Sequence, residues 1–310
     1  MTKGEDNLVA WMAGRLRDRD QRSESDGVTL DIGDDMALLA PGGGAIAVTS
    51  DMLMDGVHFD TQVHDPRAIG RKALAASLSD CAAMAVRPRW VLVSLALPDA
   101  WSMEQAQTLF LGIEDLAKAF DCTIIGGDTN SWTRPLVVDV TVLAEPYPDV
   151  TPVRRDGVVA GDELFVTGRL GGSLLEHHLA FTPRVAEAYA LARRLGSDLH
   201  AMMDLSDGLS TDAARMARSS GCGLVFDTDA IERVVSDTAR EMSREDGRSP
   251  LDHALNDGED FELLFASAAG ALEQPETTRV GIAIDEPGVW LRTANGIRTP
   301  LEPVGWRHFQ

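Results

Sequence analysis

The sequence is poor in positive charge. Lysine and arginine total 28 of its 310 residues, against 49 aspartates and glutamates, so the formal net charge is −21 at pH 7. A field of that sign repels nucleic-acid backbones and anionic membrane surfaces, and we expect neither as a partner. A ligand that carries phosphate would have to arrive together with metal cations.

Cysteine and long apolar runs are also scarce. Cys81, Cys122 and Cys222 are far apart, and no Cys-x-x-Cys or Cys/His zinc spacing occurs, so buried reduced thiols in a cytoplasmic protein are the favoured interpretation. We expect no signal peptide. The most apolar run, over 90–97, is far shorter than the roughly 20 residues of a membrane span and is typical of a buried strand.

Familiar nucleotide-binding and catalytic signatures are missing. The sequence has no P-loop, no Gly-x-Gly-x-x-Gly fingerprint, no protein-kinase motifs and no Gly-x-Ser-x-Gly turn. The acidic residues over 204–208 do not have the spacing of an EF-hand loop. These absences exclude P-loop chemistry and argue against the other protein classes that these signatures mark.

The length predicts two domains, at roughly 150 residues for each. Pro146, Pro148 and Pro152 mark a boundary, which we place between 147 and 148. Both parts mix strands with amphipathic helices. We therefore predict two side-by-side α+β domains, 1–147 and 148–310.

In the first domain we predict a helix and a charged loop over 1–26, strands over 37–40, 45–50, 90–97, 123–125 and 136–144, and helices over 65–85 and from Ser102. Asp65 caps the helix that opens with Pro66, and Ser102 with Gln105 has the pattern of a capping box. One face of the second helix is expected to be buried, and it consists of Met103, Ala106, Phe110, Ile113, Ala117 and Phe120.

In the second domain we predict helices over 183–195 and 208–219, and strands over 163–167, 224–227, 261–266 and 279–284. The glycine-rich stretch 168–172 follows the first of these strands and precedes a helix. It either binds a phosphate at the helix N-terminus or forms a plain tight turn, and both remain open.

The most informative residues are acidic side chains at strand ends or in apolar company. Ionised carboxylates are costly in such places unless they are paired or coordinated. Hard oxygen ligands gathered in a cleft suit Mg²⁺, and two or more ions would neutralise a triphosphate and steady a transferred phosphoryl group. The residues are Asp34, Asp35, Asp51, Asp80, Asp128, Asp204, Asp207 and Glu259.

Each of these motifs has a structural alternative. Taken singly, an acidic motif is more often a turn, a cap or a solvated loop. Asp207 could cap the helix from Gly208, and His58 could be a hydrogen-bonded structural histidine. Asp80 is the hardest to explain in this way, because an aspartate amid Leu, Ala and Cys on a helix needs a partner.

In their order along the chain, these motifs resemble the thiamine-monophosphate kinase family, within the superfamily of aminoimidazole-ribonucleotide synthetase. The resemblance runs from about residue 32 to residue 306. It rests on Gly33-Asp34-Asp35, Thr49-Ser50-Asp51, Asp55-Gly56-Val57-His58-Phe59, Leu78-Ser79-Asp80, Gly126-Gly127-Asp128-Thr129, Arg155-Asp156-Gly157 with Gly161-Asp162, Asp204-Leu205-Ser206-Asp207-Gly208-Leu209, and Gly258-Glu259-Asp260-Phe261-Glu262-Leu263.

The resemblance implies a reaction and a set of residue roles. ATP would give its γ-phosphoryl group to the phosphate of thiamine monophosphate, with several Mg²⁺ ions, and the first domain would bind ATP and Mg²⁺. The N-terminal domains would pair their sheets in a homodimer. Magnesium positions match Asp34, Thr49, Ser50, Asp51, Asp80, Asp128, Asp204 and Asp207; nucleotide contacts match Gly127, Asp128, Arg155 and Ser206; substrate contacts match His58, Glu259 and Trp306.

No side chain is expected to act as a general base, because the acceptor phosphate is already ionised at neutral pH. Catalysis can rest on positioning and on charge neutralisation. Three positions depart from the family pattern: Ser50 replaces a threonine, Arg87 stands where glycine is usual, and Asn130 stands where a hydroxyl residue is common. The alternatives are another ATP-dependent synthetase of the superfamily and a non-catalytic nucleotide-binding sensor.

Overall fold

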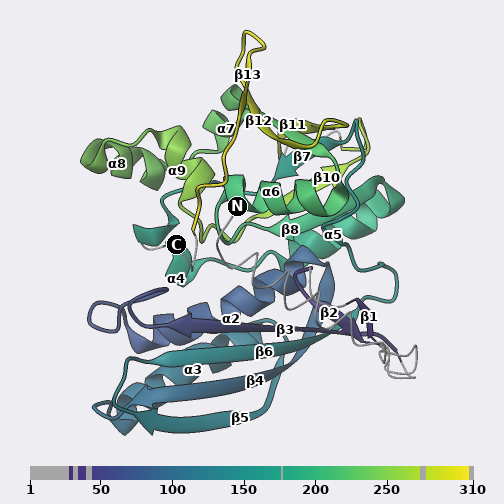
Figure 1. Cartoon of the computed structure of the whole chain (residues 1–310). Coiled ribbons are helices and arrows are strands. Elements are labelled where there is room, and N and C mark those ends of the chain that lie inside the picture. The colour runs from purple at the N-terminus through teal and green to yellow at the C-terminus, as the bar shows by residue number, and fades with distance from the viewer. Residues whose placement is uncertain (1–27, 31–33, 40–43, 176, 273–276, 307–310) are drawn as a thin grey trace, which may run out of the picture.

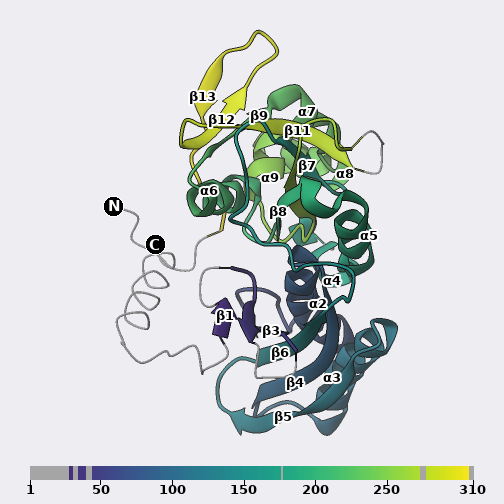
Figure 2. The same cartoon turned by 90° about the vertical axis from the view of Figure 1, so that its right-hand side faces the viewer.

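The computed structural model describes residues 28–30, 34–39, 44–175, 177–272 and 277–306, so the helix and loop predicted over 1–26 lie outside it. Two mixed β-sheets carry the described chain, one from each half, with helices between and around them (Figures 1 and 2). The predicted α+β class is confirmed. Among the described helices, none has the length and apolar character needed to cross a membrane.

The N-terminal sheet has six strands in the order β1-β2-β3-β6-β4-β5. All pairs are antiparallel except β4 with β5. β3 and β4 are longer than predicted, because β6 pairs with both of them along their length. The strands are β1 Val28–Leu30, β2 Ala37–Leu39, β3 Ile46–Met54, β4 Val86–Pro98, β5 Thr123–Trp132 and β6 Val137–Pro146.

Two helices, α2 (Pro66–Ala83) and α3 (Met103–Ala119), pack together beside this sheet. Both predicted caps are confirmed, since Asp65 accepts from the backbone N–H of Arg67 and Ser102 forms its capping box with Gln105. Close approach requires glycine, because a Cβ atom on Gly70 would lie 2.0 Å from the carbonyl oxygen of Leu109.

The predicted buried face of α3 is wrong at two positions. Met103 and Phe110 are exposed, because α2 meets α3 along a neighbouring stripe. A Cβ atom on Gly112 would lie 2.0 Å from a carbonyl oxygen of α2, which places the contact at this residue. The residues that α3 buries are Leu109, Gly112, Ile113, Leu116 and Ala117.

The C-terminal sheet has seven strands in the order β13-β12-β9-β11-β7-β10-β8. The strands are β7 Glu163–Val166, β8 Leu199–Asp204, β9 Gly223–Asp227, β10 Leu263–Ser267, β11 Thr278–Ile284, β12 Gly288–Arg292 and β13 Arg298–Pro300. The helices are α4 His177–Ala180, α5 Val185–Leu195, α6 Leu209–Ser220, α7 Thr228–Val234, α8 Asp237–Asp246 and α9 Pro250–Asn256. The sequence patterns did not predict β8, β12, β13 or α7 to α9.

Helix α2 also packs against the C-terminal half. It contacts α4, α5 and β8, and one apolar core contains residues of both sheets. Phe181 and Phe261 stack at a centroid distance of 4.2 Å within this shared core. The predicted boundary between 147 and 148 falls in the connection from β6 to β7. Residues on α2 can therefore meet residues of either half.

Candidate functional site

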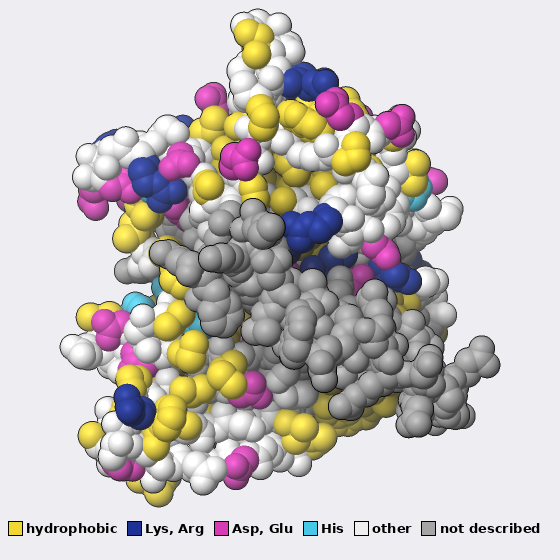
Figure 3. Space-filling model, in the orientation of Figure 1, with side chains coloured by type: hydrophobic (Ala, Val, Ile, Leu, Met, Phe, Trp, Pro, Cys, Tyr) yellow, Lys and Arg dark blue, Asp and Glu magenta, His cyan; other side chains and the backbone are white. Residues whose placement is uncertain are grey.

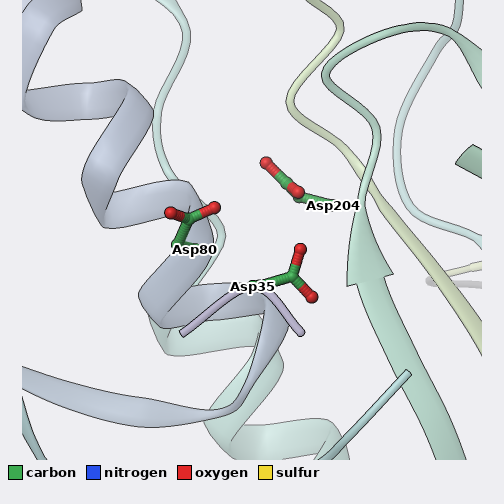
Figure 4. A group of neighbouring side chains, drawn as sticks. All are labelled: Asp35, Asp80 and Asp204. Atoms are coloured by element: carbon green, nitrogen blue, oxygen red, sulfur yellow. The ribbon is translucent and has the colours of Figure 1, made fainter. Parts of the chain in front are cut away.

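Three aspartates from distant parts of the sequence meet where the two halves face each other. Each contributes a carboxylate oxygen that lies within 4.8 Å of the other two (Figure 4). Asp80 comes from the C-terminal part of α2, Asp204 ends β8, and Asp35 precedes β2. This acidic cluster, defined as Asp35, Asp80 and Asp204, is the convergence that the aspartate motifs predict for a cation site.

The cluster is electrostatically costly without a cation. The pKa of Asp35 is raised to about 8, chiefly by burial; the charge of Arg155 lowers it, and the charges of Asp204 and Asp34 act with burial to raise it. The pKa of Asp80 is also raised, first by burial and then by the charges of Asp51, Asp204 and Asp35. Since like charges this close oppose each other's ionisation, a divalent cation suits the donor set.

Unpaired oxygens support the same interpretation. Within the described residues, the buried Oδ2 atoms of Asp35 and Asp51 have no hydrogen-bond partner. Burial raises the pKa of Asp51 to about 6, with Ser77 lowering it and the negative charge of Asp204 raising it. A buried carboxylate oxygen with no donor is costly unless a cation binds it. Asp51 therefore adds a fourth candidate ligand beside the cluster.

Neighbouring hydroxyls hold two of the carboxylates in place. The Thr49 hydroxyl donates to Oδ2 of Asp80, and the Ser79 hydroxyl donates to Oδ2 of Asp204 at 2.7 Å. Thr49 and Asp51 point to the same side of β3, because side chains alternate along a strand. Thr49 thus lies beside the acidic cluster, bonded to Asp80.

Ser50 lies on the opposite side of β3. Its hydroxyl donates to Asp139 at 3.1 Å and lies 2.8 Å from the Thr141 hydroxyl, both on β6. The strand predicted over 45–50 ends at Ser50, whereas β3 continues to Met54. The structure therefore does not bring Ser50 to the acidic cluster.

Asp34 and Asp35 make different contacts. Oδ1 of Asp34 accepts from the backbone N–H of Asp35 at 2.9 Å, and Oδ2 accepts from that of Arg155 at 3.3 Å. Asp35, which the resemblance did not single out, is the member that enters the cluster. The two residues are adjacent in the sequence, so only the folded backbone distinguishes them.

Arg155 lies against the acidic cluster. Its Nη2 donates to Oδ1 of Asp35 at 2.5 Å. Burial lowers the pKa of its guanidinium, but the charges of Asp35, Asp34 and Asp204 outweigh this and raise it overall. The guanidinium is thus charged and placed at the edge of the acidic cluster.

Gly127 and Asp128 lie away from the cluster. They belong to β5, three strands from β3, which corresponds to about 14 Å at the usual strand spacing. Asp128 is exposed and accepts from the backbone of Thr129 and from the Asn130 amide at 2.8 Å. A Cβ atom on Gly127 would lie 1.7 Å from the Val93 carbonyl oxygen, so β5 can approach β4 only with glycine here.

The loop over 204–208 connects the cluster to the candidate substrate contacts. Asp207 pairs with Arg215 at 2.5 Å, and its carbonyl accepts from the backbone N–H of Trp306 at 3.0 Å. The carbonyl of Ser206 accepts from the N–H of Glu259 at 2.7 Å. Gly208 precedes α6 without a side-chain cap, so the alternative of Asp207 as a cap does not hold.

His58 and Glu259 are joined through a residue that the sequence analysis missed. The buried Lys72 ammonium donates to the His58 carbonyl and, at 2.6 Å, to Oε2 of Glu259. Nδ1 of His58 accepts from the backbone N–H of Met54 at 3.0 Å. Lys72, like Asp80, is a charged residue on a helix that is otherwise mostly apolar. Such a residue needs a partner, so the argument made for Asp80 would also have identified Lys72.

The glycine-rich turn over 168–172 binds carboxylates of the chain itself. The N–H of Gly171 donates to Asp260 at 2.9 Å, and that of Gly172 donates to Asp257 at 3.0 Å. Burial raises the pKa of Asp260 to about 8, while bonds from Ser173 and Gly171 oppose the shift. Since these donors are occupied, the structure favours the plain turn over a phosphate site.

Comparison with known proteins gives matches over nearly the whole chain. The model for the N-terminal domain of AIR synthase related proteins matches residues 33–145, and that for the C-terminal domain matches residues 158–285. The thiamine-monophosphate kinase of Rhodopirellula baltica is 36% identical, over 98% of this chain and 97% of that protein.

Solved structures agree with these matches. AaThiL complexed with AMPPCP and TMP has a TM-score of 0.84 at 27% identity, covering 99% of this chain and 97% of that chain. Thiamine monophosphate kinase from Aquifex aeolicus has a TM-score of 0.78 at 25% identity, covering 96% and 98%. The fold is therefore shared with these proteins over nearly the whole chain.

Proposed function

The chain belongs to the thiamine-monophosphate kinase family, and on this premise we propose that it transfers the γ-phosphoryl group of ATP to the phosphate of thiamine monophosphate. The products are thiamine diphosphate and ADP. The observation that carries the proposal is the acidic cluster of Asp35, Asp80 and Asp204 with Arg155 against it. A relative with this fold is complexed with AMPPCP and TMP.

We assign the cation ligands from the geometry and from the family pattern together. Asp35, Asp51, Asp80 and Asp204 are the primary set, with Thr49 oriented by its bond to Asp80. Asp34 and Asp207 adjoin this set. Bound Mg²⁺ would neutralise phosphate charge and polarise the transferred group.

The side chains of the protein then bind and orient the two substrates. The planar Arg155 guanidinium suits a phosphate oxygen of ATP, and Ser206 lies in the loop that follows Asp204. His58, Glu259 and Trp306 remain our assignments for thiamine monophosphate. Since the acceptor oxygen is already ionised, proximity and charge neutralisation suffice.

We further propose that a homodimer completes the site. Asp128 lies about 14 Å from β3 within one chain, and β5 is an edge strand. Met52, Ile125 and Trp132, on β3 and β5, are exposed, and Figure 3 shows apolar side chains at the surface of the lower, N-terminal half. Pairing of two N-terminal sheets would cover such residues and would supply Gly127 and Asp128 from the partner.

One assay separates this function from its alternatives. The chain is incubated with ATP, MgCl₂ and thiamine monophosphate, and thiamine diphosphate is measured by chromatography. Turnover only with a purine-ribonucleotide substrate would support another synthetase of the superfamily, and ATP binding without turnover would support a sensor. We place the enzyme in the cytoplasm, where its three buried free cysteines, Cys81, Cys122 and Cys222, would stay reduced.

A further inference from the structure

Lys72 is an unusual residue in this protein. The sequence has three lysines, Lys3, Lys72 and Lys118, and the second is 1% exposed in the middle of α2. Its Nζ contacts the His58 carbonyl, Nδ1 of His178 at 2.7 Å and Oε2 of Glu259 at 2.6 Å. Burying an ammonium group is costly unless it is paired, so these contacts require an explanation.

We propose that Lys72 and His178 are positioning residues that keep Glu259 ionised and aim its second oxygen at the positively charged thiazolium part of thiamine monophosphate. This inference rests on the proposed function and on the assignment of Glu259 to the substrate. Neither Lys72 nor His178 belongs to the motifs that the family resemblance rests on.

The two oxygens of Glu259 have different surroundings. Oε2 lies 2.6 Å from Nζ of Lys72 and 3.0 Å from Nδ1 of His178. No described residue donates a hydrogen bond to Oε1, and the Glu259 side chain is 17% exposed. One oxygen is therefore fixed by the protein while the other is available to a ligand.

The charges are consistent with this arrangement. Burial raises the pKa of Glu259, but the His178 hydrogen bond and the Lys72 charge outweigh it and lower the pKa overall. Burial lowers the pKa of Lys72, and Glu259 opposes that shift. Buried ion pairs of this kind add little net stability compared with apolar residues, so a role in ligand binding accounts for the pair better than folding does.

The backbone of Glu259 is held as firmly as its side chain. Its φ of 53° is in the left-handed region, and its N–H donates to Ser206 at 2.7 Å. Phe261, two residues on, has a φ of 50° and donates to Leu205 at 2.8 Å. Strain of this kind persists only where the surroundings enforce it, and it is concentrated at ligand sites.

The sign of the charge selects which part of the substrate Glu259 can face. An ionised carboxylate repels the phosphate of thiamine monophosphate and attracts its thiazolium ring. The phosphates of both substrates belong instead with the cations of the acidic cluster. Glu259 would then orient the organic part while the cluster holds the reacting phosphate.

The test is Lys72→Met, which keeps the length of the side chain and removes its charge. The KM for thiamine monophosphate should rise about 10- to 100-fold, the range for a charge-assisted hydrogen bond. The KM for ATP and kcat should change less than about threefold, because the cluster is untouched. A double-mutant cycle adds the specific readout: in a Glu259→Gln background, Lys72→Met should have no further effect on KM.

Two further variants complete the test. Lys118→Met is the matched control, because that lysine is exposed and, among the residues that the structure describes, forms an ion pair with Glu114 alone, on α3. His178→Phe keeps the ring volume and removes the other contact to Oε2, so KM should rise in the same direction. It carries the test if Lys72→Met does not fold, since Nε2 of His178 bonds to no other described residue.

The outcomes separate the two proposals. If the unaltered chain makes no thiamine diphosphate, the proposed function fails and this inference fails with it. If it turns over but folded Lys72→Met and His178→Phe keep their KM for thiamine monophosphate, only this inference is overturned. Equal losses in kcat and in both KM values would also overturn it, because a merely structural lysine predicts that result.

Discussion

Asp51→Asn should make the metal-free protein more stable and the enzyme nearly inactive. Burial raises the pKa of Asp51 to about 6 from its ordinary 3.8. A carboxyl whose folded pKa is raised contributes stability below its unfolded pKa and loses it as pH rises through the folded one. The difference between these two pKa values corresponds to about 3 kcal/mol. Asparagine cannot ionise, so the variant avoids this loss.

The measurement is urea unfolding of both proteins in EDTA at pH 4 and pH 7.5. The stability difference between variant and parent should increase by about 3 kcal/mol from the lower to the higher pH. Saturating Mg²⁺ should stabilise the parent by about 2.7 kcal/mol at a hundred times its Kd, and the variant by much less. Asp99→Asn, at an exposed position before α3, is the control, and saturating Mg²⁺ should stabilise it as much as it stabilises the parent.

Turnover should fall at least about 100-fold in Asp51→Asn, because a charge that acts on the transition state is lost. A rate within about threefold of the parent, or equal stabilisation by Mg²⁺ in the two proteins, would refute the assignment of Asp51 as a cation ligand. Loss of stability at pH 7.5 in EDTA would refute the electrostatic account of the site.

Three other predictions follow from the same geometry. Co-expressed Asp51→Asn and Asp128→Asn chains should recover about one quarter of the parent activity if the partner supplies Asp128, because about half of the dimers are mixed and each mixed dimer keeps one of its two sites; they should recover none if each site lies within one chain. Gly127→Ala should lower stability by about 1–3 kcal/mol in thermal melts, because the new Cβ would lie 1.7 Å from the Val93 carbonyl oxygen. Gly126→Ala is the control: this glycine also has a positive φ, but the nearest atom to a Cβ there is 3.6 Å away, so the difference between the two variants measures the clash. Arg155→Lys should weaken ATP binding about 10- to 100-fold by calorimetry, since lysine lacks the planar guanidinium; unchanged affinity would remove its assignment to the nucleotide.

Local signals predicted the elements that depend on local chemistry. The cap at Asp65 and the capping box at Ser102 are where the sequence places them, because both involve residues within three positions of each other. β8 was not predicted, since its Leu-His-Ala-Met-Met-Asp sequence has no β-branched residue and becomes a strand by pairing with β10. The polar α8 was missed for a different reason, because it has few apolar residues and buries only Ala239.

The sequence predicted which motifs belong to the site, but not how their side chains are arranged in space. Resemblance named Asp80 and Asp204, and the fold brings them together, but it takes Asp35 rather than Asp34 into the cluster. Strand alternation would have predicted that Ser50 and Asp51 face opposite sides of the sheet, had the predicted strand included Asp51. That Asp128 lies on a distant strand depends on sheet order, which no local pattern contains.

Helix α2 explains how the separated motifs act as one site. Asp80 enters the acidic cluster, Ser79 donates to Asp204 from the same turn, and Lys72 holds Glu259. Eight residues separate Lys72 from Asp80, which corresponds to about 12 Å along a helix. Because α2 is buried between the two halves, this separation is fixed before any ligand binds. On the proposed roles of Glu259 and of the acidic cluster, α2 would therefore select a substrate that carries a positive charge and a phosphate at a set distance.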